Sequence, residues 1–368
     1  MSDNREKSLE KPLEKPPEKA PGKPLMYISS SPHIGSPVNS RALMGRVLNA
    51  LAPVSIFGIV LYGIPALLTI FVSVAAAEIA EALFRKITRQ ELRYKDASAA
   101  VTGLLLALTL PPGTPLWMTA LGSAFAIIVA KEFFGGLGAN VFNPALIGRA
   151  FLLMSFPVAL TSWPVPKAFF TAGAAGAVDT LSSATPLVLL KEGSVVAEVG
   201  AGLAAAGLVS GSDYWSMIGG VFLGFRQGCI GESSILLILI GFVYLLVTKT
   251  IDWRAPVSMI LSVFFFSLLF GRDPLFAILA GGVIFGAIFM TTDYVTAPLT
   301  ASGKLIFGFG AGLITVLIRQ WGSYPEGVTY GILIMNAITP FLNKLLQKKY
   351  GYVKPQKAAK EPAKGGAK

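Results

Sequence analysis

Apolar runs long enough to cross a lipid bilayer recur along this sequence of 368 residues, and they restrict its fold more than any other feature. Of the residues, 53% are hydrophobic and only 14% are charged. The hydrocarbon core of a bilayer holds no water, so a spanning segment must satisfy its own backbone groups, and long apolar runs do so as α-helices. We therefore expect an all-α polytopic membrane protein.

Eleven apolar segments can be delimited between two polar tails. One of them, residues 213–228, is rich in glycine and interrupted by Arg226, so we expect it not to cross the membrane fully. About ten crossings remain, some of them broken helices, since segments 97–110 and 256–270 are short enough to be half-helices. The segments lie near residues 43–62, 64–84, 97–110, 116–134, 148–160, 213–228, 233–249, 256–270, 274–291, 303–319 and 327–343.

Positive residues predict the orientation. The loop of residues 85–95 holds five lysines and arginines, and three lysines, Lys344, Lys348 and Lys349, follow the last segment. Short cytoplasmic loops carry an excess of such residues, so both termini should be cytoplasmic and the loop of residues 161–212 should lie on the outer face of a prokaryotic cytoplasmic membrane. The net charge of +11 has the same cause, and we expect no nucleic-acid partner.

We divide the chain into five parts. Residues 1–40 repeat Glu-Lys-Pro and cannot bury a core, so a disordered tail is expected, with no cleavable signal peptide. A first membrane half (41–160), the outer loop (161–212), a second membrane half (213–345) and a lysine-rich cytoplasmic tail (346–368) follow.

The two halves look related to each other. The runs Val141–Arg149 and Val295–Lys304 each place a proline at a break and a glycine with a cation just before an apolar segment. Matched interruptions of this kind mark the core of a repeat-built membrane protein, although two ordinary loops could also coincide.

Histidine and cysteine are nearly absent, with one of each, His33 and Cys229. One chain with this inventory cannot ligate an iron–sulfur cluster, a bis-histidine haem or a structural zinc ion. We expect His33 at the surface and Cys229 as a small packing residue, with no metal site. If the protein moves electrons, an organic cofactor must carry them.

The longest polar interruption ends in Asp179–Leu187, where small residues surround Thr185. The residues directly before it are Ser182, Ser183 and Ala184. In one interpretation Thr185 is a helix N-cap, with Pro186 at the first helical position. In the other, its hydroxyl carries a covalent group. The two are compatible, because a helix N-terminus also favours a phosphate.

A glycine-rich stretch, Gly135–Asn143, precedes Arg149. Gly138 and its neighbours permit left-handed backbone and close approach of a ligand. Asn140 and Asn143 can each donate and accept hydrogen bonds, and Arg149 can pair with an anion. Glycine also serves helix packing in lipid, so the stretch alone fits either use.

Acidic residues lie beside apolar segments, where an unpaired charge is costly. Glu232 follows Gly231, and Asp293 precedes Thr296; each acid is a functional candidate, or else a cap or interface charge. Further along, Glu326 and Asn336 could likewise coordinate a cation or orient a cofactor.

Three more acids belong to the first half. Glu78, Glu81 and Glu132 could form a cation path, or could face the inner interface near Lys86 and Lys131.

These runs together resemble the membrane flavoprotein subunits RnfD and NqrB over about residues 40–345. Asn140–Arg149 is similar to their Asn-x-Phe-Asn-Pro-Ala-x-x-Gly-Arg signature, and Gly228–Ser234 to Gly-x-Ile-Gly-Glu-Thr/Ser-Ser. Thr292–Pro298 resembles Thr-Asp-x-Val-Thr-Ala-Pro, and the run from Pro325 to Asn336 resembles a Pro-Glu-Gly…Met-Asn segment. Ser182–Thr185 resembles the attachment motif Ser/Thr-Gly-Ala-Thr, with Ser183 in place of glycine.

The resemblance implies FMN esterified to Thr185, and a second, non-covalent flavin, riboflavin, within the bundle. The cofactor-binding residues that it implies are Asp179, Ser182, Ser183, Ala184, Thr185, Gly138, Asn140, Asn143, Arg149, Gly231, Glu232, Asp293 and Thr296.

The implied partners are the other subunits of an Rnf-type complex, membrane lipid, and Na⁺ or H⁺ as the ion moved. Such complexes couple electron flow between ferredoxin and NAD to cation movement. The length and compact loops favour the RnfD type. The alternatives are the B subunit of a Na⁺-translocating NADH:quinone reductase and a non-redox channel or transporter.

Overall fold

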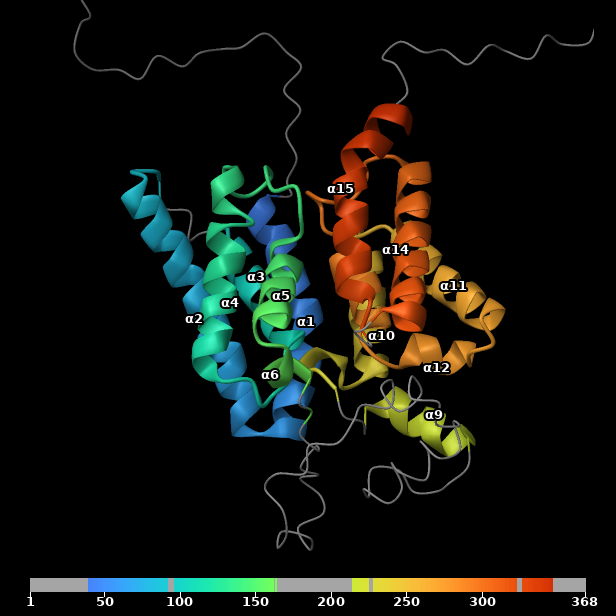
Figure 1. The fold of residues 1–368 in the computed structure, drawn as a ribbon. Helices are drawn as coiled ribbons and strands as arrows, with labels where there is room; N and C mark the ends of the chain where they lie inside the picture. The colour runs from blue at the N-terminus through green and yellow to red at the C-terminus, as the bar shows by residue number, and fades with distance from the viewer. Residues whose placement is uncertain are drawn as a thin grey trace, which may run out of the picture. The chain divides into compact units, whose positions relative to one another are not determined.

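The computed structural model describes residues 39–91, 96–161, 163, 214–224, 228–322 and 326–346, all within one compact unit. Within these ranges every regular element is helical (Figure 1). The expected terminal tails and nearly all of the expected outer loop, residues 161–212, lie outside the described residues.

Four described helices are long and apolar enough to cross a membrane: Ser40–Tyr62, Ile64–Ile87, Leu116–Phe134 and Ala301–Trp321. Shorter apolar helices accompany them, so the chain is an all-α polytopic membrane protein. The elements of the first half are α1 (Ser40–Tyr62), α2 (Ile64–Ile87), α3 (Ser98–Leu108), α4 (Leu116–Ile128), η1 (Glu132–Phe134), α5 (Pro144–Ser155) and α6 (Pro157–Thr161). Those of the second are α9 (Tyr214–Leu223), η2 (Ile230–Glu232), α10 (Ile235–Val247), α11 (Arg254–Leu269), α12 (Pro274–Leu279), α13 (Val283–Phe285), the π-helical turn η3 (Gly286–Met290), α14 (Ala301–Trp321) and α15 (Val328–Leu346).

Polar caps and prolines set where many helices begin. The Asn39 side chain accepts a hydrogen bond from the Ala42 amide at the start of α1, and Asp273 and Thr300 cap α12 and α14 in the same way. Gly63, with φ of 72°, makes the sharp turn between α1 and α2.

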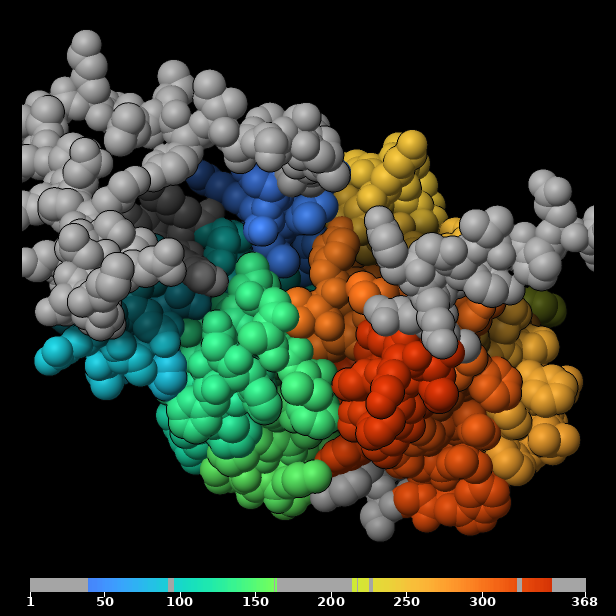
Figure 2. All heavy atoms as spheres, turned by 90° about the horizontal axis from the view of Figure 1, so that it is seen from above, coloured from blue at the N-terminus to red at the C-terminus, as the bar shows by residue number. Residues whose placement is uncertain are grey.

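The two halves lie side by side when viewed from one end of the bundle (Figure 2). In the second half, α11 and α14 approach closely because Gly308 has no side chain. A Cβ added there would lie only 2.3 Å from the Ala255 carbonyl oxygen. Gly312 repeats this contact one turn later, against the Met259 carbonyl oxygen at 2.7 Å. Small residues that let helix backbones touch are the usual basis of helix association in membranes.

The start of α1 and the end of α15 lie at the same end of the bundle (Figure 1). We call it the terminal end. The loop before α14 also lies there, since the Leu299 amide donates to the Asn343 side chain of α15 at 2.9 Å. The chain therefore makes an even number of crossings between these points, whichever side of the membrane the terminal end faces.

Short helices are prominent, as expected. Helix α3 has 11 residues and spans only about 16 Å at 1.5 Å per residue, well short of the ~30 Å of a hydrocarbon core. The described part of segment 213–228 contains the 10-residue helix α9, and the expectation that this segment is not one full crossing stays a prediction.

Two expected boundaries were wrong. Helix α5 begins at Pro144, not near residue 148, because Asn143 caps it and Pro144 takes the first helical position, so Arg149 lies inside the helix. Segment 274–291 is not one helix: α12 ends at Leu279, and the chain resumes as α13 and η3 after Gly281, whose φ is 69°. The glycine pair 281–282 breaks the helix, and Gly282 lies against a buried carboxylate described below.

Candidate functional site

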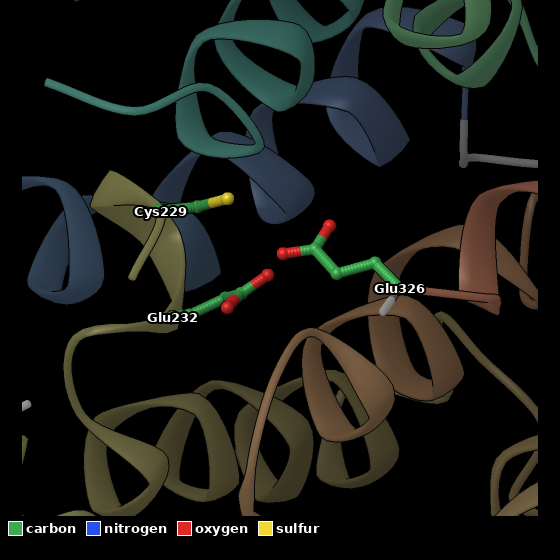
Figure 3. Close-up of side chains that lie close together, drawn as sticks. All are labelled: Cys229, Glu232 and Glu326. Carbon is green, nitrogen blue, oxygen red and sulfur yellow. The ribbon is translucent and has the colours of Figure 1, made fainter. Parts of the chain in front are cut away.

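Four polar residues meet inside the bundle, and we call them the central cluster: Arg149, Cys229, Glu232 and Glu326. Figure 3 shows the last three of them. Arg149 of α5 forms an ion pair with Glu326, which precedes α15. Its guanidinium also donates to the Cys229 sulfur at 3.6 Å. Because Arg149 and Glu326 come from different halves, this pair links the two halves of the bundle.

The two carboxylates of the central cluster point toward one another (Figure 3). Ligand atoms of Cys229, Glu232 and Glu326 lie within 4.8 Å of one another. A Cβ added at Gly282 would meet a Glu232 oxygen at 2.6 Å, so the break after α12 makes room for this carboxylate. Since the Arg149 guanidinium already supplies positive charge to Glu326, the geometry is that of a buried charge-assisted hydrogen-bond group.

A narrow cavity of about 80 Å³ lies nearer the terminal end, and we call it the asparagine cavity. Its polar lining includes Ser98, Lys131, Asn140, Asn143 and Asp293. Its walls are mainly apolar, with Val101, Leu105, Leu245 and Phe289 among them. Apolar walls with a few placed polar groups are typical of small-molecule sites.

The two asparagines use only part of their hydrogen-bonding capacity. The Asn143 oxygen accepts from the amides of Ala145 and Leu146, at 3.0 and 3.4 Å, and thereby caps α5. The Asn140 amide nitrogen donates to the Phe142 carbonyl at 3.1 Å. Within the described residues, the amide nitrogen of Asn143 and the oxygen of Asn140 thus remain available, one as a donor and one as an acceptor.

The glycine-rich stretch before these asparagines has the predicted backbone. Gly135, Gly136 and Gly138 have φ of 109°, 90° and 97°. Only glycine adopts this region without strain, which confirms the prediction of left-handed backbone. A Cβ at Gly136 would also come within 2.7 Å of the Arg85 guanidinium.

Asp293 and Thr296, both predicted from one signature, bind each other. The Asp293 carboxylate accepts from the Thr296 hydroxyl at 3.0 Å and from the Val295 amide at 3.4 Å. Asp293 also lines the asparagine cavity. Gly231 instead lets η2 pack on α3, since an added Cβ would meet Leu108 at 2.7 Å.

A buried ion network adjoins the asparagine cavity. Glu81 pairs with Lys131 at 2.7 Å and with Arg85 at 3.3 Å, and Arg85 pairs with Glu132 at 3.1 Å. The Lys131 ammonium also donates to the Ser98 hydroxyl at 2.7 Å. The expected neighbour Lys131 is confirmed, whereas Lys86 is exposed and Arg85, which sequence reasoning did not single out, takes its place.

Sequence reasoning also missed the role of Cys229. It is fully buried, as predicted for a packing residue, but it also accepts from Arg149. Its position between Gly228 and Ile230, within a signature that also holds Glu232, was the available signal. Asn336 is fully buried, and neither atom of its side-chain amide has a hydrogen-bond partner among the described residues.

The predicted attachment site lies outside the described residues. This applies to Asp179, Ser182, Ser183, Ala184 and Thr185.

The fold and the sites define the class of protein: a polytopic helical membrane protein with buried polar groups where broken helices meet. Residues 27–351 match the sequence model of the NQR2, RnfD, RnfE family. The chain belongs to this family.

Named relatives cover nearly the whole chain. The D subunit of a proton-translocating ferredoxin:NAD(+) oxidoreductase complex from Clostridium ljungdahlii is 43% identical over 334 residues, 88% of this chain and 96% of the relative. The D subunit of a Na(+)-translocating complex of the same kind from Acetobacterium woodii is 41% identical over 335 residues, 90% of this chain and 98% of the relative. The D subunit of an ion-translocating oxidoreductase complex from Stutzerimonas stutzeri is 38% identical over 324 residues, covering 82% of this chain and 89% of the relative.

Proposed function

We propose that this chain is the flavin-bearing membrane subunit of an ion-translocating ferredoxin:NAD⁺ oxidoreductase complex. The names of the relatives support the assignment to such a complex with other subunits as partners. We propose H⁺ or Na⁺ as the ion that the complex moves, because relatives of nearly equal identity are named for each.

The observation that carries the flavin assignment is the asparagine cavity. The edge of an isoalloxazine ring offers both a hydrogen-bond donor and acceptors. The Asn143 amide nitrogen and the Asn140 oxygen, which no other described group uses, can pair with an acceptor and a donor of that edge, and the apolar walls suit an aromatic ring. The cavity volume of about 80 Å³ admits the edge of the ring rather than the whole ring, so we propose that the cavity widens when the flavin binds. A flavin bound there would supply one- and two-electron redox chemistry, which the side chains of this protein lack.

The protein's own residues would hold and surround this flavin. Asn140 and Asn143 would orient the ring edge, and apolar side chains would exclude water. Lys131, hydrogen-bonded to Ser98 and paired with Glu81, would place one positive charge in the lining. We propose riboflavin as this non-covalent flavin and FMN as a second flavin, esterified to Thr185.

The orientation is part of the proposal. With the terminal end in the cytoplasm, the helix ends that carry Arg85, Lys249, Arg254 and Lys344 obey the positive-inside rule, and residues 161–212 fall outside. A cysteine placed at Ser194 in a Cys229→Ser background should react with an impermeant reagent added from outside. Labelling only from the cytoplasmic side would reverse the orientation.

The two proposed flavins can be told apart because only the covalent one stays on the denatured protein. Denatured, purified protein should keep one fluorescent flavin, and peptide mapping should find FMN on the fragment Thr180–Lys191. Thr185→Ala should remove this covalent flavin and leave the extractable one. Asn143→Ala should lower the extractable flavin and leave the covalent one. A colourless, correctly assembled protein would refute the proposal.

A further inference from the structure

A second cavity, about 470 Å³ in volume, opens at the terminal end, where α10 ends and α11 and α14 begin. We call it the cationic cavity. Lys249, Arg254 and Lys304 line it, from the α10–α11 connection, the start of α11 and the first turns of α14. It borders the asparagine cavity through the shared residues Ile251 and Thr292–Tyr294.

Positive charge exceeds negative charge in this lining. One oxygen of Asp252 accepts from both Arg254, at 2.7 Å, and Lys304, at 3.1 Å. The other carboxylate in the described lining, Asp293, is turned to Thr296. Three cations therefore face two carboxylates, and two of the cations share a single carboxylate oxygen. Such a group of donors suits an anion with several oxygens, above all a phosphate.

The surroundings of the cationic cavity are those of a membrane interface. Trp253 is 51% exposed, and the Arg254 guanidinium lies 5.7 Å from the centre of its ring. Tryptophan at helix ends commonly sits at the level of lipid headgroups. Leu299, 70% exposed, lines the same cavity.

Helices α11 and α14, which begin at the cavity, carry exposed apolar side chains along their length. These include Leu261, Phe265, Leu268, Leu305 and Phe309. The Ser258 and Ser262 hydroxyls of α11 donate to the Leu305 and Phe309 carbonyls of α14, so these two helices pack directly against each other. A charged headgroup and an apolar chain would thus find adjoining surfaces.

We propose that the cationic cavity binds the phosphate headgroup of an anionic phospholipid, whose acyl chains lie along α11 and α14. The positive-inside rule explains why cations lie at this end of the bundle, but it does not explain why three of them surround one cavity. Basic pockets between membrane helices are known sites for anionic headgroups. This proposal does not depend on the flavin assignment.

Binding can be measured by native mass spectrometry of the purified, full-length protein. Delipidated protein is titrated with phosphatidylglycerol, phosphatidylcholine or inorganic phosphate. We expect phosphatidylglycerol to bind, phosphatidylcholine to bind at least tenfold more weakly, and inorganic phosphate not to bind at the same concentration. Equal binding of both lipids would overturn the proposal, and binding of inorganic phosphate alone would overturn it in favour of a site for a free anion.

Two variants locate the site. Arg254→Gln combined with Lys304→Gln should weaken phosphatidylglycerol binding at least tenfold, whereas the control Lys344→Gln, which removes an exposed cation at the end of α15, should change it less than twofold. Equal loss in both would show general charge attraction and refute the site.

A third variant separates binding from folding. Asp252→Asn removes the carboxylate that Arg254 and Lys304 share, so lipid binding should stay equal or tighten even though these contacts are lost. Weaker binding in Asp252→Asn, parallel to the double variant, would mean that the cluster serves structure only.

Discussion

The buried ion network between α2, η1 and α3 allows a sharp test of what its acids do. Glu81→Gln leaves the Lys131 ammonium, whose side chain is 2% exposed, with the Ser98 hydroxyl as its remaining described partner. Arg85 keeps Glu132 at 3.1 Å. Removing one partner of a buried pair costs about 3–5 kcal/mol. The folded-to-unfolded ratio should therefore fall by roughly two to four orders of magnitude.

The matched control removes both charges. In Glu81→Gln with Lys131→Met, the buried ammonium is replaced by an apolar chain of similar length, and Arg85 and Glu132 still pair. Replacing a whole buried pair is often neutral, so most of the lost stability should return. The coupling energy from this double-mutant cycle should exceed about 2 kcal/mol, well above the additivity error of ~0.5 kcal/mol.

The assay is reversible unfolding in mixed micelles, followed by tryptophan fluorescence, with ion transport measured on the whole complex reconstituted with the variant subunit. A Glu81→Gln variant that stays within about 1 kcal/mol of the parent, yet loses ion transport, would refute the structural role. That outcome would favour the alternative that these acids form a cation path.

Three further outcomes are expected. Asn143→Ala should cost about 1 kcal/mol by removing the cap of α5, while Asn143→Asp should keep the cap, as thermal melts would show. Gly308→Val should separate α11 from α14 and lower the melting temperature markedly, because its Cβ would lie 2.3 Å from a carbonyl oxygen, whereas Gly45→Ala, with open space around it, should not. Partial burial opposes ionisation of Asp252, but hydrogen bonds from the Arg254 amide and from Lys304 outweigh it and hold its pKa below the usual value. This carboxylate therefore stabilises the fold above pH ~4 and loses that contribution as the pH falls through its lowered pKa, a dependence that melts of Asp252→Asn should lack.

The class of fold could be predicted from the sequence because lipid leaves few choices. Long apolar runs had to be helices, and the positions of α1, α2 and α14 follow from run length alone. The residues at which helices begin were harder to predict from the sequence. Arg149 looked like a residue before a helix, because its segment was delimited by hydropathy, whereas the cap at Asn143 decided the boundary.

Which polar residues meet in the folded bundle could not be predicted from the sequence. The sequence singled out Arg149, Glu232 and Glu326 in three separate runs, but nothing in spacing along a chain says that α5 and α15 meet. Arg85 was hidden for the opposite reason. It stands in a run of positive residues that suits an exposed loop, and only the fold turns it inward to Glu132 while its neighbour Lys86 stays exposed.

The shortness of α3 has a consequence for moving charge. The amide of Ile230 donates to the carbonyl of Leu110, just beyond the end of α3, so η2 meets this helix end inside the protein rather than at its far surface. Peptide dipoles and the nearby carboxylate of Glu232 thereby interrupt what would otherwise be a continuous insulating layer. A cation passing this way would face two thin dielectric barriers in series instead of one thick one, and the electric potential across the membrane would fall most steeply over those two thin regions.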